Sequence, residues 1–239
     1  MPWYAKPKWG YNLSQTDTEI QANIRMINGF LNSTGYYLYA QAGILGNMYA
    51  ESGINPWRWQ NESVDLTDRY KGYGLFQYTP AYEYVNNCST VEGYAPNLSI
   101  PTPSAGAMPH DGWAQMIVFD EDLLGKWSSR CWGWGWDPSE YPELYLLRQG
   151  ILDTWGNGSS ITQEQFKSIG GQSFDTNLIS ATFVFLACFE QPAVPNLNER
   201  VQYARIIYPW LDGTIPPEPP TPGGRKRGLK VWQMALRHR

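Results

Sequence analysis

Histidine and cysteine are scarce in this chain. Its 239 residues contain two histidines, His110 and His238, and three cysteines, Cys88, Cys131 and Cys188. A zinc enzyme needs several nitrogen, sulfur or carboxylate ligands at short spacing, and a cysteine nucleophile needs surroundings that lower its pKa. Neither pattern is present, so we expect no metal or other cofactor and no zinc or cysteine peptidase. Because Cys188 lies in an apolar segment, we expect a small core residue there and no disulfide framework.

Long apolar runs and a secretory leader are also missing. No segment approaches the roughly 18 uncharged residues of a membrane-spanning helix, and Met1–Lys6 does not resemble the start of a signal peptide. Hydrophobic residues nevertheless make up 42% of the chain, which is enough for a folded core. We therefore expect a globular protein without a membrane span and without export by a signal peptide.

The segment from Gly35 to Gly53 has the pattern of a helix with a buried face. Its apolar residues recur at spacings of three and four, and Glu51 continues the same stripe, three residues after Met48 and seven after Ile44. Gly53 suits a left-handed C-cap and Pro56 forbids continuation, so we expect the helix to end near Ser52. A carboxyl group on an apolar face loses hydration, which favours its protonated form. Such a glutamate is a candidate general acid near neutral pH.

Two other interpretations of Glu51 stay open on helix geometry alone. A buried glutamate is often paired with an arginine, and a residue at a helix end is often exposed to solvent. Neither arrangement requires catalysis.

The segment from Gly72 to Thr79, with the sequence Gly-Tyr-Gly-Leu-Phe-Gln-Tyr-Thr, indicates a short strand or turn. Its glycines allow another backbone or a ligand to come close. Gln77 offers a donor and an acceptor, as recognition of hydroxyl and N-acetyl groups requires. Tyr73 and Tyr78 flank it and are further candidates for substrate binding.

Taken together, these motifs resemble the lysozyme superfamily. Glu-Ser-Gly-x-Asn-Pro at 51–56 is followed by Gly-Leu-x-Gln-aromatic-Thr at 74–79, and a third segment, 181–192, ends in Phe-Glu-Gln-Pro before Glu199-Arg200 and Tyr203-Ala204. The pattern is most similar to the tail-associated lysozyme domains of bacteriophages. It is more distantly similar to goose-type lysozymes and lytic transglycosylases. The resemblance runs from about residue 16 to residue 211.

The resemblance implies a fold, a substrate and a location. The fold would be mainly α (α+β), with a small β-hairpin beside a glycan cleft. Glu51 would be the general acid and Gln77 would lie near the cleaved bond, the β-1,4 linkage between N-acetylmuramic acid and N-acetylglucosamine in peptidoglycan. The protein would be made in the host cytoplasm and carried in the virion tail to open the cell wall for genome delivery.

A second carboxylate is common in glycosidases, and its distance from the first distinguishes retention from inversion. Asp65 and Asp68, on the approach to the Gly-rich segment, are the candidates that the resemblance favours. For each of them, however, a solvated loop acid that caps or pairs with Arg69 and Lys71 is the favoured interpretation. Goose-type enzymes manage with one dominant glutamate, so the assignment does not depend on finding the partner.

Aromatic residues are abundant, with 12 tryptophans and 16 tyrosines. Trp57 and Trp59 follow Glu51 closely and are candidates to pack against sugar rings, although large aromatic side chains equally often fill a core. For the alternation of Trp132, Trp134 and Trp136 with glycine we favour a structural role.

The chain divides into four parts: an arm at 1–14, a lysozyme-like catalytic domain at 15–213, a Pro/Gly-rich linker at 214–224 and a basic tail at 225–239. Within the domain we expect five helices, near 16–31 with a capping box at Thr16–Glu19, 35–53, 112–127, 176–189 capped by Asp175, and 198–208 ending before Pro209. Six of the 18 basic residues and none of the 22 acidic ones lie beyond residue 224, so the rest carries a formal charge of −10.

This charge distribution makes nucleic acid an unexpected partner for the main domain. The basic tail at 225–239, with its interleaved apolar residues, suits docking to a phage tail or other virion protein. A membrane-surface helix, a nucleic-acid contact and a disordered solubilising end are the alternatives for the tail. For the whole chain, the alternatives to a hydrolase are a lytic transglycosylase with the same site and a non-catalytic virion component that builds the particle or binds glycan.

Overall fold

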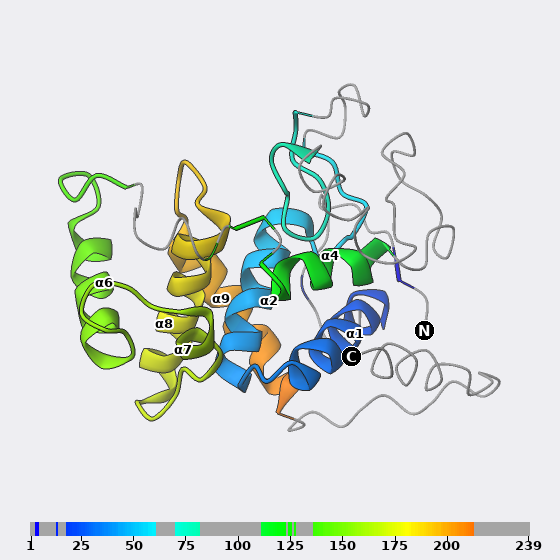
Figure 1. Ribbon diagram of the computed structural model, residues 1–239. Coiled ribbons are helices and arrows are strands. Elements are labelled where there is room, and N and C mark those ends of the chain that lie inside the picture. The colour runs from blue at the N-terminus through cyan, green and yellow to red at the C-terminus, as the bar shows by residue number, and fades with distance from the viewer. Residues whose placement is uncertain are drawn as a thin grey trace.

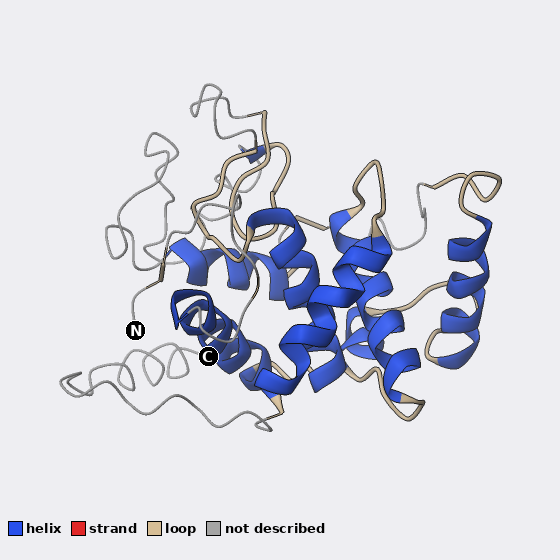
Figure 2. Ribbon diagram, turned by 180° about the vertical axis from the view of Figure 1, so that it is seen from behind, coloured by secondary structure: helices blue, strands red, loops and turns tan. Residues whose placement is uncertain are grey.

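Helices dominate the structure, and their arrangement is clear from both sides (Figures 1 and 2). The computed structural model describes residues 3–4, 13, 18–60, 70–81, 111–122, 124–125, 127 and 136–212. The helices are α1 (Thr18–Ser33), α2 (Leu38–Ser52), α4 (Asp111–Asp120), α6 (Pro142–Thr154), α7 (Gln163–Lys167), α8 (Phe174–Phe185), the π-helix η1 (Leu186–Glu190) and α9 (Leu197–Leu211). The predicted mainly helical fold is therefore confirmed. In place of a regular hairpin, the described residues contain isolated antiparallel bridges, Trp59–Tyr73 and Tyr73–Tyr78.

Helix α2 occupies the centre, with α8 and α9 packed along it. Two glycines allow this close approach. A Cβ atom on Gly43 would lie 2.8 Å from backbone atoms of Ala181 and Thr182 in α8, and one on Gly46 would lie 2.6 Å from the carbonyl oxygen of Arg200 in α9. Because α2 has neighbours on most sides, its residues are buried nearly all round and not along one stripe only.

Helix α2 ends where the sequence predicts, at Ser52. Gly53 adopts φ 65° and its N–H donates to the carbonyl of Tyr49, which is the left-handed C-cap expected of glycine. The chain then turns sharply away from the helix axis. This ending fixes Glu51 in the last turn of the central helix.

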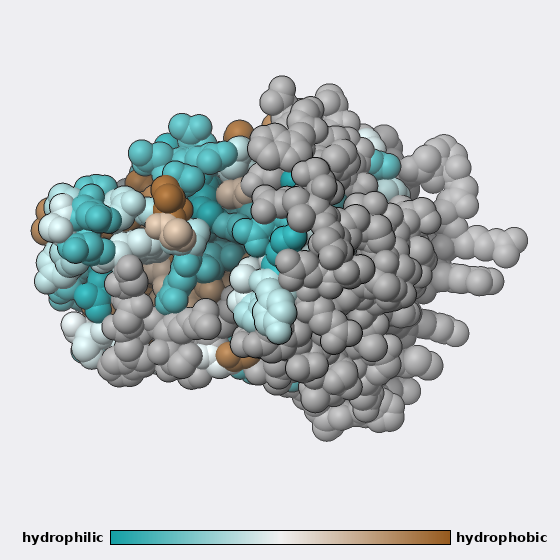
Figure 3. All heavy atoms as spheres, turned by 90° about the horizontal axis from the view of Figure 1, so that it is seen from above, coloured by the Kyte–Doolittle hydropathy of each residue, from teal (hydrophilic) through white to brown (hydrophobic). Residues whose placement is uncertain are grey.

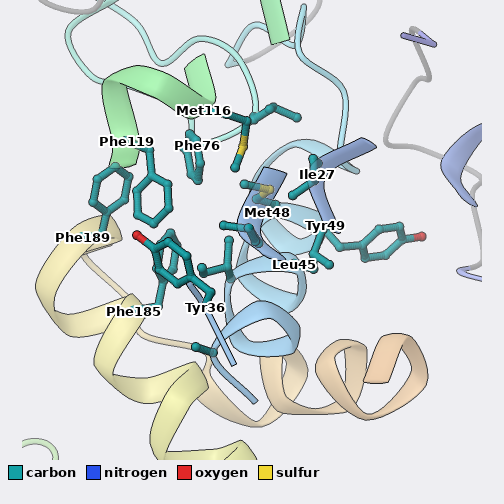
Figure 4. Packing of buried hydrophobic residues seen from close by; sticks show 14 of the residues in the cluster. Ile27, Tyr36, Leu45, Met48, Tyr49, Phe76, Met116, Phe119, Phe185 and Phe189 are labelled. Carbon is teal, nitrogen blue, oxygen red and sulfur yellow. The ribbon is translucent and has the colours of Figure 1, made fainter. Parts of the chain in front are cut away.

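The core beside α2 is rich in phenylalanine (Figure 4). Phe76 from the Gly-rich segment, Phe119 from α4 and Phe189 from η1 meet with ring centroids 5.0–5.2 Å apart. Burying a ring of this size stabilises a fold by about 2 kcal/mol. These rings therefore attach the Gly-rich segment and α4 to η1, the continuation of α8.

Several predicted helix boundaries need correction. Helix α4 ends at Asp120 and does not reach Trp127, because Asp122 adopts a left-handed conformation (φ 47°) that stops a helix. The N-cap of α8 is Ser173, whose side chain accepts from the N–H of Thr176, and Asp175 lies inside the first turn.

Helix α9 departs from the prediction at both ends. It begins at Leu197 after Asn196 and runs on to Leu211, with Pro209 inside its last turn. Proline removes one backbone donor, but near the end of a helix this loss does not stop the final residues from remaining helical.

Two further predictions, on the N-terminal arm and on Cys188, can be compared with the structure. Trp3 and Tyr4, from the predicted arm, pack against the domain: Trp3 is fully buried, and Tyr4 exchanges backbone hydrogen bonds with the Asn23 side chain. Cys188 is buried but disulfide-bonded, so the prediction of a simple core thiol is wrong. Burial alone does not reveal whether a cysteine has a partner.

The predicted Pro/Gly-rich linker at 214–224 and the basic tail at 225–239 lie outside the described residues, as do Thr16 and Asp17 of the predicted capping box. Among the helices that are described, none combines the length and apolar character that crossing a membrane requires.

Candidate active site

Glu51 lies in the last turn of α2, and its side chain is 20% exposed. Its Oε1 atom forms an ion pair with Nη2 of Arg200, a residue of α9 whose side chain is 6% exposed. Oε2 has no hydrogen-bond partner among the residues that the structure describes. One of the two alternatives to a simple protonated acid, the arginine-paired glutamate, is thus present in this structure.

Arg200 is anchored by more than its ion pair. Its Nη1 donates to Oδ1 of Asn47 at 3.1 Å, and its Nε donates to the carbonyl of Pro195 at 3.2 Å. Asn47 lies one turn before Glu51 and in turn donates to the carbonyls of Gly43 and Thr182. The guanidinium is therefore fixed by three groups from α2 and from the chain that precedes α9.

The ion pair with Arg200 fixes the orientation of the Glu51 carboxyl group, because the planar guanidinium is itself held in place. Oε2 is the carboxyl oxygen that this ion pair does not use.

The chain that follows Glu51 is strained. Gly53 and Ile54 are both left-handed, with φ 65° and 59°, and a positive φ at a β-branched residue is a rare conformation that typically costs about 1–3 kcal/mol. Asn23 holds the turn through a hydrogen bond of 2.9 Å from Nδ2 to the carbonyl of Ile54. Strained residues of this kind concentrate at binding and catalytic sites.

The Gly-rich segment lies directly beside this turn. Ser52, the neighbour of Glu51, donates from its hydroxyl to the carbonyl of Leu75 at 2.9 Å. Gln115 of α4 joins the two segments, because its Oε1 accepts from the N–H of Leu75 at 2.6 Å and its Nε2 donates to the carbonyl of Pro56 at 2.7 Å. The two motifs that carry the lysozyme resemblance are thus brought together by hydrogen bonds.

Gln77 is half-buried in this segment, with φ 46°. Its Nε2 donates to the carbonyls of Arg58 at 3.0 Å and Gly74 at 3.1 Å. Its Oε1 accepts no hydrogen bond from the described residues. The amide is therefore held by its nitrogen and presents an acceptor, which suits a sugar hydroxyl or an acetamido N–H.

Tyr73, Tyr78, Trp57 and Trp59, the aromatic candidates for substrate binding, have exposed fractions of 0–1%. Trp59 packs on Tyr73 with ring centroids 4.7 Å apart, and the Tyr78 hydroxyl donates to the carbonyl of Gln115. Tyr73 and Tyr78 also exchange backbone hydrogen bonds with each other. In this structure Trp59, Tyr73 and Tyr78 support the Gly-rich segment from within, and Trp57 is buried in the core.

The remaining predicted site residues, Asp65 and Asp68, lie outside the described residues. Sequence reasoning missed the roles of Asn47 and Gln115. Their amides make contacts between residues far apart in the chain, which no local pattern indicates. Arg200 belongs to a segment that carries the family resemblance, but residue spacing does not identify Glu51 as its partner.

A mainly helical domain whose central helix ends in Glu51 and Ser52 before a strained turn, with the Ser52 hydroxyl hydrogen-bonded to a Gly-rich segment, is lysozyme-like. Comparison with known proteins agrees. A sequence model of the phage tail lysozyme family matches residues 22–107, which include Glu51 and Gln77. The resemblance to phage tail lysozymes is therefore confirmed.

A relative of known name extends the comparison. Over 195 residues, 82% of this chain, the sequence is 28% identical to Morphogenesis protein 1 of Bacillus phage B103. The chain spans about 40% of the length of that relative. The similarity therefore reaches well past the stretch that the family model matches, but it covers only part of the phage protein.

Proposed function

We propose that this protein cleaves the β-1,4 bond between N-acetylmuramic acid and N-acetylglucosamine in peptidoglycan, with Glu51 as the general acid. One observation carries the proposal. Within the family-matched stretch 22–107, Glu51 is the single carboxylate among the described residues, and it lies at the strained end of the central helix.

In the proposed reaction, Oε2 of Glu51 protonates the glycosidic oxygen as the C–O bond breaks. The leaving sugar departs with that proton, and an oxocarbenium-like centre develops on the other sugar. Water then adds to this centre and releases a proton, with Asp65 or Asp68 as the proposed second carboxylate. Arg200 stabilises the carboxylate left on Glu51, and Oε1 of Gln77 accepts a hydrogen bond from the bound sugar.

The proposed setting is the phage tail, where wall cleavage opens a path for the genome. The similarity to phage tail lysozymes supports this setting. The basic tail at 225–239 is the proposed contact to a virion protein.

A lytic transglycosylase would use the same acid but let a hydroxyl of the substrate attack in place of water. Its products would carry an anhydro end and no new reducing end. Measurement of reducing ends during wall digestion separates the two chemistries, and we expect them to increase.

A non-catalytic virion component is the second candidate, and the ion pair favours it. Glu51 bound to a buried, triply anchored arginine is also what a purely structural glutamate looks like. The relative in phage B103 is named for morphogenesis. Such a protein would bind wall sugars or build the particle without releasing fragments.

Glu51→Gln tests the proposal directly. The amide keeps the shape of the side chain but cannot supply the proton, and general acids typically contribute about 10²- to 10⁴-fold to rate. We expect clearing of a cell-wall suspension to fall by about that factor, with the circular dichroism spectrum unchanged. Glu164→Gln, at a carboxylate that is 81% exposed, is the matched control and should keep full activity.

Two outcomes contradict the proposal. If the Glu51→Gln variant clears walls as fast as the parent chain, another residue supplies the proton. If the folded parent chain releases no fragments from walls but binds them, the non-catalytic candidate is correct.

A further inference from the structure

A cavity lies away from Glu51, between α6 and the loop from Gln191 to Asn196, here called the 191–196 loop. Its volume is about 330 Å³. Tyr141, Glu143, Leu144 and Leu147 line one side, and Val194 to Asn198 line the other. A smaller hollow of about 100 Å³ continues along α6, sharing Tyr141 and Leu144 and adding Trp136 and Phe183. We call the larger space the α6 cavity.

The α6 cavity has an apolar floor and a polar rim. Leu144 is buried, and Tyr141 contributes a half-buried ring. Glu143, Asn196 and Asn198 are exposed, and their side chains have no hydrogen bond or ion pair with any described residue. On the α6 side of the molecule, the surface seen from above mixes hydrophobic residues with hydrophilic ones (Figure 3).

The wall formed by the 191–196 loop is held in a strained shape. Gln191 and Asn196, the residues at its two ends, have φ 45° and 41°. Nε1 of Trp136 donates to the carbonyl of Pro192 at 3.0 Å, and Arg200 holds the carbonyl of Pro195. Asn196 makes no side-chain cap for α9, although asparagine is among the best N-cap residues. The loop is thus fixed from both sides, while the side-chain amide of Asn196 has no hydrogen bond with the described residues.

We propose that the α6 cavity is a second glycan site, which holds one N-acetylated sugar of the wall polymer away from the bond that is cleaved. A pyranose ring has an apolar C–H face and a polar edge. Tyr141 and Leu144 suit the face, while the amides of Asn196 and Asn198 and the carboxylate of Glu143 suit hydroxyl and acetamido groups. The volume lies at the lower end of ligand pockets, about 300–1,000 Å³, and matches a single ring better than a long chain.

The charge of the rim argues against an anionic wall polymer. Among the described residues that line the cavity, Glu143 is the only ionisable group besides Tyr141, so a phosphate-rich chain bound there would meet repulsion. Arg148 lines the smaller hollow and not this cavity. A neutral sugar has no such penalty.

The site is separate from the family match, because α6 and the 191–196 loop both lie outside residues 22–107. It is still connected to Glu51. Pro195 lines the cavity and accepts from Arg200, and Arg200 binds Glu51. This inference rests on the proposed function for the identity of the polymer. A strand anchored in the α6 cavity would be retained between cleavage events, so the site acts on the KM for polymer and not on kcat.

The test uses the full chain carrying Glu51→Gln, so that the probe stays intact. N,N′,N″-triacetylchitotriose is titrated while the backbone amide signals of Leu144, Leu147, Leu197 and Asn198 are followed by NMR. We expect these signals to shift. Adding Glu143→Gln and Asn198→Ala should weaken the affinity read at Leu144 and Leu197 by about tenfold, as loss of two polar contacts implies.

The control carries Glu140→Gln and Gln202→Ala, which make matching changes at exposed residues outside the cavity lining. Its affinity should equal that of the parent. The inference is overturned if the cavity signals do not shift, or if the cavity and control variants bind equally well. It is also overturned if, with Glu51 restored, the cavity changes leave the KM for wall polymer unchanged. The proposed function fails differently, by absence of cleavage, which leaves the titration unaffected.

Discussion

The polar side chains on the two sides of the 191–196 loop differ in whether they have hydrogen-bond partners. On the side of α2, the guanidinium of Arg200 meets Pro195, Asn47 and Glu51, so each of its nitrogens has a partner. On the side of α6, the side chains of Glu143, Asn196 and Asn198 have none among the described residues. One face is a closed network and the other is an open rim.

The difference separates positioning from binding. A buried charge must be paired, and a network that pairs it also fixes the orientation of every member. Exposed amides around an apolar hollow cost little free energy in the absence of a ligand, because water molecules form hydrogen bonds with them until a ligand binds. The closed face therefore sets the geometry of Glu51, and the open face is where a sugar gains new contacts.

Removing Arg200 is the strongest way to break the closed face. Arg200→Ala leaves Glu51 without its cation and the acceptors on Asn47 and Pro195 without their donor. We expect the free energy of unfolding, measured with urea, to fall by about 3 kcal/mol. The control is Arg205→Ala, since Arg205 pairs with Asp175 at side-chain exposures of 44% and 65% and should contribute less than about 0.5 kcal/mol.

A double-mutant cycle sharpens this result. If the network acts as a unit, Glu51→Gln and Arg200→Ala should be non-additive, with a coupling of about 1–3 kcal/mol. Additive losses would show that the ion pair contributes little and that Arg200 acts through its other contacts.

Gly46 sets the spacing of the same face. A Cβ atom at this position would lie 2.6 Å from the carbonyl oxygen of Arg200, which is backbone and cannot swing away. Gly46→Ala should therefore cost about 2 kcal/mol in thermal or urea unfolding, despite the better helix propensity of alanine. Gly29→Ala in α1 is the control, because nothing lies within 4 Å of its Cβ position, and it should be neutral or stabilising. Equal effects at the two glycines would contradict a tight contact between α2 and α9.

The part of the site that lies close together in sequence could be predicted. Helix periodicity, Gly53 and Pro56 were sufficient to end α2 at Ser52 and to place Glu51 in its last turn. The pairing of this motif with Gly74–Thr79 led to the correct family resemblance. These signals are local, so a single sequence contains them.

Contacts between distant residues could not be predicted. Arg200 and Glu51 are 149 residues apart, and nothing in either segment identifies the other as its partner. The same holds for Gln115, which joins Pro56 to Leu75. Helix α6 was missed although Pro142 in its first turn and Glu143 beside it are typical of a helix start. The four aromatic candidates for substrate binding show a further difficulty, because composition does not distinguish aromatic residues that pack against sugar rings from those that fill a core.

The smallest predicted effect concerns the open face. Trp136→Phe keeps an aromatic ring but removes the hydrogen bond from Nε1 to Pro192 that fixes the 191–196 loop. We expect a loss of about 1 kcal/mol in unfolding free energy and a two- to fivefold weaker binding of triacetylchitotriose at the α6 cavity, roughly as one lost neutral hydrogen bond implies. Trp155→Phe is the matched control, because Nε1 of Trp155 donates to the carbonyl of Gly170 at the same 3.0 Å but lines neither hollow. If both variants lose similar stability but only Trp136→Phe binds the sugar more weakly, the hydrogen bond to Pro192 preorganises the cavity. If both variants bind the sugar equally well, the shape of the cavity does not depend on this hydrogen bond.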